Sequence, residues 1–379
     1  MPKRVIYVLC AMAFWTSHAQ AVPLLQNSTI AKYAYLIDQT SNTVLIDKEA
    51  EAKMYPASMT KIMTAYMAFR QLKDDLIRLD DQVLVSRKAN RMGGSKMFIE
   101  EGKTVALEDI LRGIIVQSGN DASVALAEFI AGDEASFAEL MNATAASIGM
   151  TGTNFVNASG WPDENHYTTA KDLAILSDRM IKDFPNLYEI FSEKSFTFSD
   201  ITQNNRNKLL GKSGVDGIKT GHTEASGYGM VSSGVQDGRR LILVLNGLKN
   251  SAKRASESLR LLNLAFRSTA SKVFYTEQDI ITALPVWYGK KTDLNVRASR
   301  PVSLTEKATL LKEVTRTVTY EKPLRAPIKA GQKIGQIHLH TKDKIILSVD
   351  ILAAESIAEQ SYLERFSSNI NYLLWGARP

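Results

Sequence analysis

The amino-acid sequence predicts an α/β (α+β) domain with an antiparallel sheet and a helical subdomain, followed by a small all-β sandwich domain. Strand patterns occur near residues 33–46 and again from Ile218, and helical periodicity fills the stretch between them. After about Val273 short strands alternate with proline and glycine turns. Helical segments enclosed by strands from both ends of the first domain favour an antiparallel sheet.

The first domain is expected to span residues 22–272. Tyr33–Ile37 and Thr43–Ile46 have the composition of two strands, and a polar turn joins them. Helices are expected to dominate from about Leu107 to Ile181. An earlier helix pattern starts at Pro56, where apolar residues recur at three- and four-residue spacing: Ile62, Ala65, Tyr66 and Phe69.

The first domain is expected to end with a hairpin and a helix. Tyr228–Val235 and Arg239–Leu245 flank Gln236-Asp237-Gly238, which is a hairpin turn signal. The helix predicted over Ala252–Phe266 follows the second strand.

The all-β domain is expected to span residues 273–352, and residues 353–379 form a helical C-terminal tail. Its strand patterns alternate β-branched with polar residues at Val314–Tyr320, Ile334–His340 and Lys344–Ile351. Tyr362, Phe366, Ile370 and Leu373 fall on one stripe of the tail helix, which suits a membrane surface. The alternative is a helix packed on its own β domain.

Residues 1–21 have the pattern of a secretory signal peptide. Lys3 and Arg4 form a positive start, Val5–Trp15 is apolar, and Ala19-Gln20-Ala21 matches a cleavage site. An uncleaved membrane anchor is the alternative, but the apolar run is well short of the ~20 residues that a spanning helix needs. The protein is therefore expected to be exported.

The composition is that of a globular protein, with 379 residues of which 45% are hydrophobic and 23% charged. Removing the two charges of Lys3 and Arg4 from the net charge of +6 leaves +4. Basic residues form no run, so a nucleic-acid partner is not expected. The single cysteine, Cys10, lies in the predicted signal, so the mature chain would form no disulfide.

Ser58-Met59-Thr60-Lys61 is a Ser-x-x-Lys motif that occurs once in the sequence. On a helix, residues three apart share a face, so a desolvated Lys61 could take the proton of Ser58 and make it a nucleophile. A helix N-terminus would also place backbone N–H groups beside Ser58. The alternative is a helix-capping serine with a surface lysine.

Two later motifs complete an ordered set. Ser118-Gly119-Asn120 interrupts two helical patterns, where its Ser and Asn side chains could relay a proton and bind a carbonyl group. Lys219-Thr220-Gly221 opens a strand, where a cation and a hydroxyl could meet a carboxylate. A plain turn and a solvated strand end are the alternatives for each alone. Together, the three motifs are typical of β-lactamases and penicillin-binding proteins.

The sequence resembles the low-molecular-mass penicillin-binding proteins, the D-alanyl-D-alanine carboxypeptidases of the serine peptidase S11 family. The likeness extends beyond the three motifs. Trp161 departs from the family pattern, which has a smaller apolar residue at this position. The segments that carry the resemblance are 55–61, 118–122, 154–160, 166–170, 216–223 and 287–290.

The resemblance implies a penicillin-binding, β-lactamase-like transpeptidase fold for the first domain and an acyl-enzyme mechanism. Ser58 would attack the carbonyl between two D-alanines, with Lys61 as base. Ser118 and Asn120 would handle protons and position the substrate.

The resemblance also implies how the substrate's end is held. Lys219 and Thr220 would face its terminal carboxylate, together with Arg254, while Gly221 leaves room for close approach. The backbone N–H groups of Ser58 and His222 would form the oxyanion hole. A solvated Arg254 paired with Glu257 or Glu193 is the alternative.

The implied substrate is a peptidoglycan pentapeptide, and β-lactams would be covalent inhibitors. No cofactor or metal is expected. The implied location is periplasmic, or the outer face of the cytoplasmic membrane, with the tail as a peripheral attachment.

Other interpretations of the protein's function stay open at this point. A β-lactamase would share the nucleophile, but neither Glu139 nor Glu164 lies in a Glu-x-x-Leu-Asn pattern. A D,D-endopeptidase of the same fold and a catalytically silent wall-binding scaffold are two further alternatives. A metallopeptidase is not favoured, because the histidines have no HExxH spacing.

Overall fold

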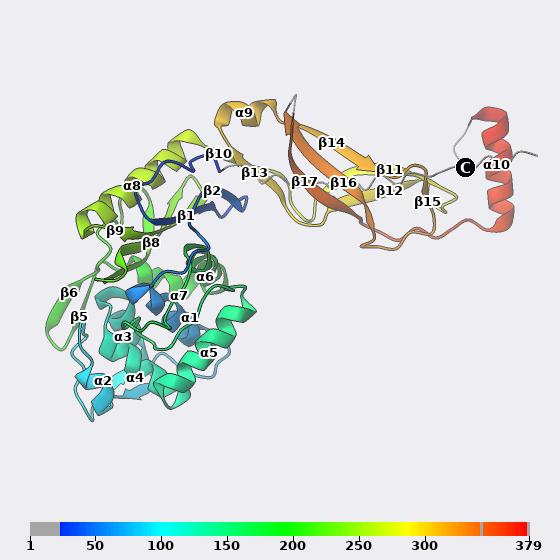
Figure 1. Ribbon diagram of the computed structural model, residues 1–379. Coiled ribbons are helices and arrows are strands. Elements are labelled where there is room, and N and C mark those ends of the chain that lie inside the picture. Colours follow the sequence, from blue (N-terminus) through cyan, green and yellow to red (C-terminus); the bar gives the residue numbers. More distant parts are fainter. Residues whose placement is uncertain (1–22, 342–343, 377–379) are drawn as a thin grey trace, which may run out of the picture.

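The computed structural model describes residues 23–341 and 344–376. They form a broad part that combines a sheet with helices, and a slender all-β part that ends in a helix (Figure 1). The predicted signal peptide, residues 1–21, and Cys10 lie outside the described residues.

A five-stranded antiparallel sheet is the base of the first part, in the order β2-β1-β9-β8-β7. Both predicted hairpins are confirmed, and strands from the two ends of the domain pair through β1 and β9. β7 is an edge strand of this sheet, and no strand among the described residues pairs with its outer side. The bounds are β1 (Tyr33–Asp38), β2 (Thr43–Lys48), β7 (Val215–Thr223), β8 (Gly227–Gln236) and β9 (Arg239–Leu248).

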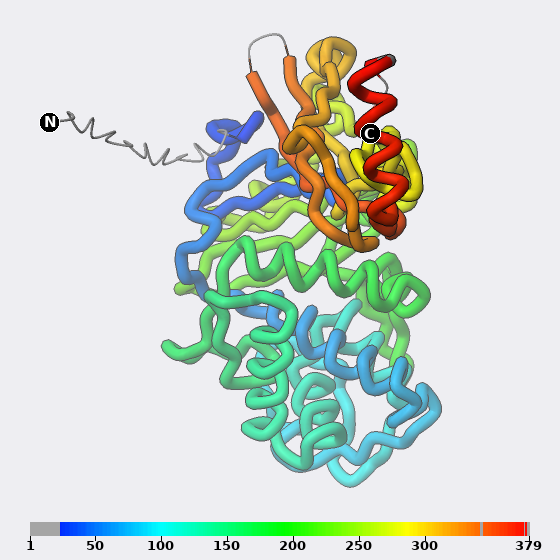
Figure 2. Tube along the Cα trace, turned by 90° about the vertical axis from the view of Figure 1, so that its right-hand side faces the viewer, coloured from blue at the N-terminus to red at the C-terminus, as the bar shows by residue number. Residues whose placement is uncertain are grey.

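Helices cover both faces of the sheet because the side chains of β9 alternate between two cores. Leu243 contributes to the core beneath α8 (Ser251–Ser268), and Val244 contributes to the core beneath α6 (Ala170–Asp183). α6 crosses between the sheet and the remaining helices (Figure 2).

The helical subdomain surrounds α1 (Lys61–Lys73), which is buried continuously from Lys61 to Phe69. Such a helix is packed on all sides rather than along one stripe. The other helices are α2 (Arg87–Arg91), α3 (Leu107–Arg112), α4 (Asn120–Ala131), α5 (Glu134–Ser147) and α7 (Pro185–Tyr188). Short turns are η1 (Ala57–Thr60), η2 (Gly113–Gln117) and η3 (Glu189–Ser192), and small strand pairs are β3 (Gln82–Leu84) with β4 (Thr104–Ala106) and β5 (Ser195–Phe198) with β6 (Ile201–Asn204).

The second part is all-β up to its C-terminal tail apart from the short helix α9 (Ala308–Glu313), with a six-stranded sheet in the order β14-β16-β17-β12-β11-β15. A separate apolar core fills it, with Leu294, Val296 and Ile351 fully buried. The predicted strands are confirmed. The bounds are β11 (Ile280–Trp287), β12 (Asp293–Ala298), β14 (Thr315–Tyr320), β15 (Leu324–Arg325), β16 (Lys333–Thr341) and β17 (Lys344–Ala353).

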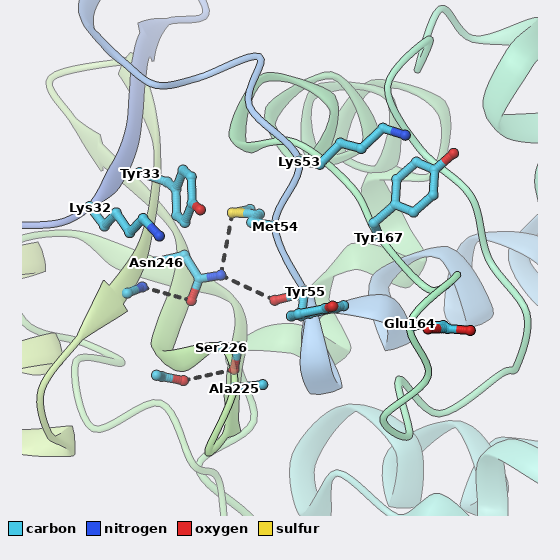
Figure 3. Close-up of a pocket in the computed structure, with 12 residues that line it drawn as sticks. Lys32, Tyr33, Lys53, Met54, Tyr55, Glu164, Tyr167, Ala225, Ser226 and Asn246 are labelled. Atoms are coloured by element: carbon cyan, nitrogen blue, oxygen red, sulfur yellow. Dashed lines mark hydrogen bonds between the residues drawn. The ribbon is translucent and has the colours of Figure 1, made fainter.

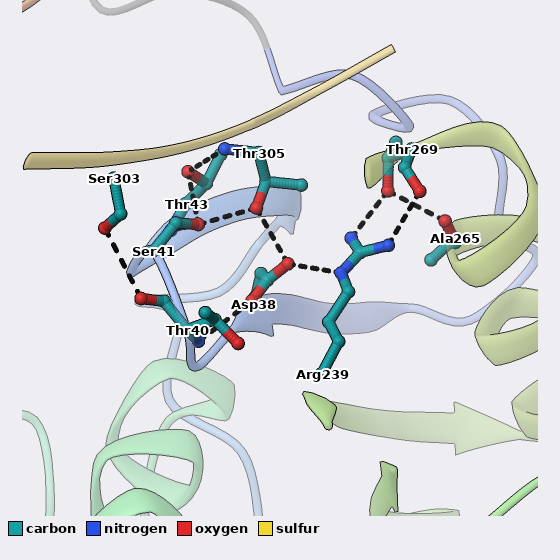
Figure 4. A network of polar contacts seen from close by, with 9 residues as sticks. All are labelled: Asp38, Thr40, Ser41, Thr43, Arg239, Ala265, Thr269, Ser303 and Thr305. Atoms are coloured by element: carbon teal, nitrogen blue, oxygen red, sulfur yellow. Dashed lines mark hydrogen bonds and ion pairs between the residues drawn. The ribbon is translucent and has the colours of Figure 1, made fainter. Parts of the chain in front are cut away.

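The two parts meet through a strand pair and a buried polar network. β10 (Ala270–Tyr275) crosses the predicted boundary at residue 272 and pairs with β13 (Val302–Glu306). The Asp38 carboxylate accepts a hydrogen bond from Arg239 Nε at 2.6 Å and one from Thr305 Oγ1 at 2.7 Å (Figure 4). Because Asp38 is fully buried, this pairing is needed to offset its desolvation.

The tail helix starts later than predicted. α10 spans Tyr362–Trp375, whereas β17 extends to Ala353 and an extended segment follows it. Ile357 in that segment is buried in the β core and bridges to Ile328, which holds the backbone away from helical geometry. Ser361 and Glu364 then form a capping box that starts the helix.

Candidate active site

Ser58 lies at the N-terminal start of the predicted helix, where the first turn is the 3-10 turn η1 directly before α1. Two neighbours press closely on this turn. A Cβ atom added at Gly160 would lie 1.8 Å from the carbonyl oxygen of Ala57, and one at Gly221 would lie 2.7 Å from that of Pro56. Glycine at both positions therefore lets the 157–166 loop and the edge strand β7 enclose the turn that carries Ser58.

Lys61 joins the predicted nucleophile to two other elements. Its Nζ lies 3.2 Å from Ser58 Oγ, 2.7 Å from Asn120 Oδ1 and 2.6 Å from the backbone oxygen of Ser159. Burial lowers the pKa of Lys61 to about 7, against the opposing effect of the Asp121 carboxylate. Lys61 is therefore placed to exchange a proton with Ser58 near neutral pH.

Asn120 and Asp121 start α4 and hold a loop beside the site. Asn120 Nδ2 donates to the carbonyl oxygen of Gly93 at 2.8 Å. The buried Asp121 carboxylate accepts from the backbone N–H groups of Met97 and Phe98, each at 2.8 Å. The second motif thus fixes the 93–98 loop as well as Lys61.

Ser118 ends the π-helical turn η2 in a left-handed conformation, with φ of 64°. π-helical turns are frequent at functional sites. The side chain is buried, and within the described part of the chain its hydroxyl has no hydrogen-bond partner. The predicted break between two helices is confirmed, while proton relay by Ser118 stays a prediction.

The third motif lies on the edge strand β7 opposite the turn of Ser58. Lys219 is buried, and its pKa is far below the usual range because of desolvation and, next, the charges of Lys61, Arg206 and Arg254. Thr220 is also buried. The His222 ring is exposed and stacks on Tyr228 at 3.8 Å between ring centroids.

Arg254 reaches the same strand from α8. Its Nη1 donates to the Gly221 carbonyl oxygen at 3.3 Å, and its guanidinium lies over the Tyr228 ring. Burial lowers its pKa. The alternative pairing is wrong, because Glu257 binds Arg260 and Glu193 binds Arg112.

Sequence reasoning missed several contacts at the site. The Ser159 carbonyl holds Lys61, and Arg206 contributes to the positive field at Lys219. His166 Nδ1 accepts from the Val156 N–H at 3.2 Å, so its Nε2–H donates to Thr60 Oγ1 at 2.8 Å. No short-range sequence pattern predicts which loop carbonyl accepts a hydrogen bond, or which residues distant in the sequence bond to each other.

Among the described residues no His, Cys, Asp and Glu side chains cluster as metal ligands would.

Comparisons with known proteins match both parts of the chain. Residues 18–250 match the family model "D-alanyl-D-alanine carboxypeptidase", Peptidase_S11, and residues 271–359 match "Penicillin-binding protein 5, C-terminal domain". The chain is 38% identical over 347 residues to D-alanyl-D-alanine carboxypeptidase DacC of Escherichia coli, covering 89% of this chain and 87% of that protein. It is 37% identical over 331 residues to DacA of Haemophilus influenzae, covering 86% and 84%.

Solved structures give the same result. Penicillin-binding protein 5 from Haemophilus influenzae superposes with a TM-score of 0.83 at 36% identity, covering 87% of this chain and 98% of that one. Penicillin-binding protein D2 from Listeria monocytogenes, in its ampicillin-bound form, matches at 27% identity with a TM-score of 0.58 and covers 62% of this chain and 97% of that one. The fold class predicted from the sequence is confirmed.

Proposed function

Because the chain belongs to the serine peptidase S11 family of D-alanyl-D-alanine carboxypeptidases, we propose that it removes the terminal D-alanine of peptidoglycan pentapeptides through an acyl-enzyme on Ser58. The observation that carries this assignment is the buried Lys61 ammonium, which contacts Ser58 Oγ and whose pKa is lowered to about 7. A serine needs such a base to become a nucleophile.

The first step forms the acyl-enzyme. Neutral Lys61 takes the proton of Ser58 while Oγ attacks the carbonyl carbon between the two D-alanines. The C–N bond then breaks, and the leaving amine takes the proton that Lys61 received, with Ser118 as the candidate relay, so that Lys61 is neutral again. Asn120 keeps Lys61 in place and is a candidate to bind the acyl amide of the substrate.

The second step is hydrolysis of the Ser58 ester. Water attacks the ester carbonyl and gives a proton to Lys61. The bond between the carbonyl carbon and Ser58 Oγ then breaks, and Lys61 passes the proton to Oγ, which releases the shortened peptide and restores Ser58. In both steps the carbonyl oxygen becomes negative, and the backbone N–H groups of Ser58 and His222 are the candidates to stabilise it.

Lys219, Thr220 and Arg254 are the candidates to bind the free carboxylate of the substrate. Two of them are cationic groups, and Arg206 adds to the positive field around Lys219. A terminal carboxylate placed there would relieve the mutual repulsion of these charges. This preference distinguishes a carboxypeptidase from a peptidase that cuts within a chain.

β-Lactams are expected to acylate the same serine. The ampicillin-bound state of the Listeria relative shows that a member of this fold accepts such a compound. Slow hydrolysis of the resulting ester would make β-lactams inhibitors rather than substrates.

We propose that the protein is exported and that α10 attaches it to the outer face of the cytoplasmic membrane. None of the described helices meets the length and apolarity that a bilayer span requires. α10 instead exposes large apolar side chains: Tyr362, Leu363, Phe366, Ile370, Leu373 and Leu374. It lies at the end of the molecule away from the first domain (Figure 1).

Release of free D-alanine tests the proposed activity. Purified protein is incubated with a pentapeptide that ends in D-Ala-D-Ala, and the released D-alanine is measured. Catalytic release that a penicillin blocks supports the proposal. Absence of release by folded, penicillin-labelled protein would contradict it.

A further inference from the structure

One cavity begins at the turn of Ser58 and a second cavity adjoins it, and the mechanism above uses neither. The near cavity, about 300 Å³, reaches Ala57 on one side and Thr223 on the other. The far cavity, about 460 Å³, lies beyond Tyr55 and contains Lys32 and Lys53 in its lining. Tyr55 lines both cavities, which makes them neighbouring compartments of one groove.

The near cavity has an aromatic and apolar wall, and Asp163 and Glu164 add two carboxylates to its lining. The Trp161 ring borders it and also lies against the loop that Asn120 holds, since a Cβ atom at Gly93 would lie 3.1 Å from that ring. Trp161 and Tyr55 remain 46% and 40% exposed, so their rings are available to a ligand. Such a wall suits the backbone and aliphatic carbons of a peptide.

The lining of the far cavity carries two lysines, Lys32 and Lys53, and one carboxylate, that of Glu164. Lys53 Nζ lies 3.9 Å from the centre of the Tyr167 ring, and Lys32 Nζ lies 5.0 Å from that of Tyr33. Neither lysine forms an ion pair with any residue that the structure describes. Figure 3 shows both lysines beside this cavity, from opposite walls. Two lysines against one glutamate leave one excess positive charge in this lining, which suits an anionic group.

The position of the catalytic groups fixes which half of a substrate can enter this groove. β7 passes Ser58 with Lys219 toward one end and Thr223 at the other. If the terminal carboxylate lies with Lys219 and Thr220, as the proposed function requires, the acyl half must leave Ser58 toward Thr223. That direction leads into the near cavity and then past Tyr55.

Resting on that function, we propose that the two cavities form one subsite for the acyl half of the peptide, in which Lys32 and Lys53 bind a carboxylate upstream of the D-alanine pair. The aromatic wall holds the intervening residues, and Tyr55 forms the passage between the compartments. The enzyme would thus prefer an acidic stem peptide to a neutral one of equal length.

A matched pair of substrates tests this preference. Both are N-acetyl-L-Ala-γ-D-Glu-L-Lys-D-Ala-D-Ala, and in one of them the glutamyl α-carboxylate is amidated. Wild-type protein should show a higher kcat/KM for the acid by about three- to tenfold, as expected for two partly exposed ion pairs. Raising the salt concentration should shrink that ratio.

The double variant Lys32→Gln/Lys53→Gln should bring the ratio close to one, while its kcat/KM for the amide stays that of the wild type. Lys103→Gln removes an exposed charge elsewhere and should keep the wild-type ratio. An acid-to-amide ratio near one in the wild type, or one that the double variant retains, overturns the subsite. Failure of the wild type to release D-alanine from either peptide would instead overturn the proposed function.

Discussion

Lys61 Nζ lies 3.2 Å from Ser58 Oγ, and the same amino group is held by the Asn120 side chain and the Ser159 carbonyl. Three elements that are distant in the sequence therefore orient one proton acceptor toward one hydroxyl. Under the proposed function, this arrangement would perform the proton transfers of both half-reactions.

The Ser58–Lys61 pair can be tested by removing each partner. Ser58→Ala should abolish covalent labelling by a fluorescent penicillin, and Lys61→Ala should slow labelling by about 10²- to 10⁴-fold, the usual contribution of a general base. Lys73→Ala is the matched control, because Lys73 ends the same helix at the surface. Thermal unfolding checks that each variant is folded. Labelling of folded Ser58→Ala would show that another residue is the nucleophile.

The pH dependence of acylation should report Lys61. Its pKa is lowered to about 7 by burial, and only the neutral amine can accept the proton of Ser58. The second-order rate constant for penicillin labelling should therefore rise as pH increases through about 7 and level off above it. A rate that rises only near the ordinary lysine pKa of about 10.4 would show that Lys61 is not desolvated in the free enzyme.

The contact between Gly160 and the turn of Ser58 gives a prediction about positioning. Gly160→Ala puts a Cβ atom 1.8 Å from the Ala57 carbonyl oxygen, at a φ of +78°. Gly132→Ala is a matched control, because φ there is +83° and no atom lies within 4 Å of the added Cβ.

Both alanine variants have the left-handed backbone cost of about 1–2 kcal/mol, but Gly160→Ala should lose about 1–3 kcal/mol more from overpacking. It should also slow penicillin acylation by about 10²-fold, because Ser58 and the Ser159 carbonyl must shift. Urea unfolding and labelling rates measure the two effects. Equal behaviour of the two variants would argue against the close packing.

The exposed apolar face of α10 predicts binding to membranes. A variant that ends at Gln360 removes α10 but keeps Ile357 in the β core, so the second part should remain folded. Full-length protein should sediment with anionic liposomes, and the shortened protein should stay in solution. In the full chain, Phe366→Ser/Leu373→Ser should weaken binding as well. If all three proteins partition equally, α10 does not bind membranes. Its role would then be to pack against the β part, as Tyr372 does against Trp287.

The sequence predicted the parts of the site that depend on short-range spacing. Ser58 and Lys61 are three residues apart, and any helical turn places their side chains together. The order of the three motifs predicted the fold, and the resemblance named the family that the comparisons confirm. Spacing alone could not distinguish the 3-10 turn η1 from the start of a helix, because both keep residues i and i+3 adjacent.

The sequence could not predict contacts that arise only from tertiary packing. The Ser159 carbonyl belongs to a loop, and any residue there would offer the same oxygen. The later start of the tail helix has a similar cause, since burial of Ile357 in the β core outweighs local helical preference. The cavity beyond Tyr55 gathers residues from both ends of the first domain, which no local pattern indicates.

Arg254 tests how the enzyme recognises the end of its substrate. Its guanidinium is mostly removed from solvent, contacts the Gly221 carbonyl oxygen and has no acidic partner among the described residues. A planar guanidinium fits a carboxylate better than an ammonium group does. Losing one charge-assisted hydrogen bond costs about 1.5–3 kcal/mol, so Arg254→Ala should lower kcat/KM for a D-Ala-D-Ala peptide by about 10- to 150-fold.

The same variant should have a much smaller effect on a peptide whose terminal carboxylate is amidated, because the lost bond is made only to the charged group. Arg260→Ala on the same helix is the control, since Arg260 pairs with Glu257 and lies 49% exposed. Arg254→Lys should recover part of the loss by restoring the charge without the planar fork. If Arg254→Ala lowers kcat/KM equally for both peptides, the residue supports the shape of β7 through Gly221 and does not bind the carboxylate.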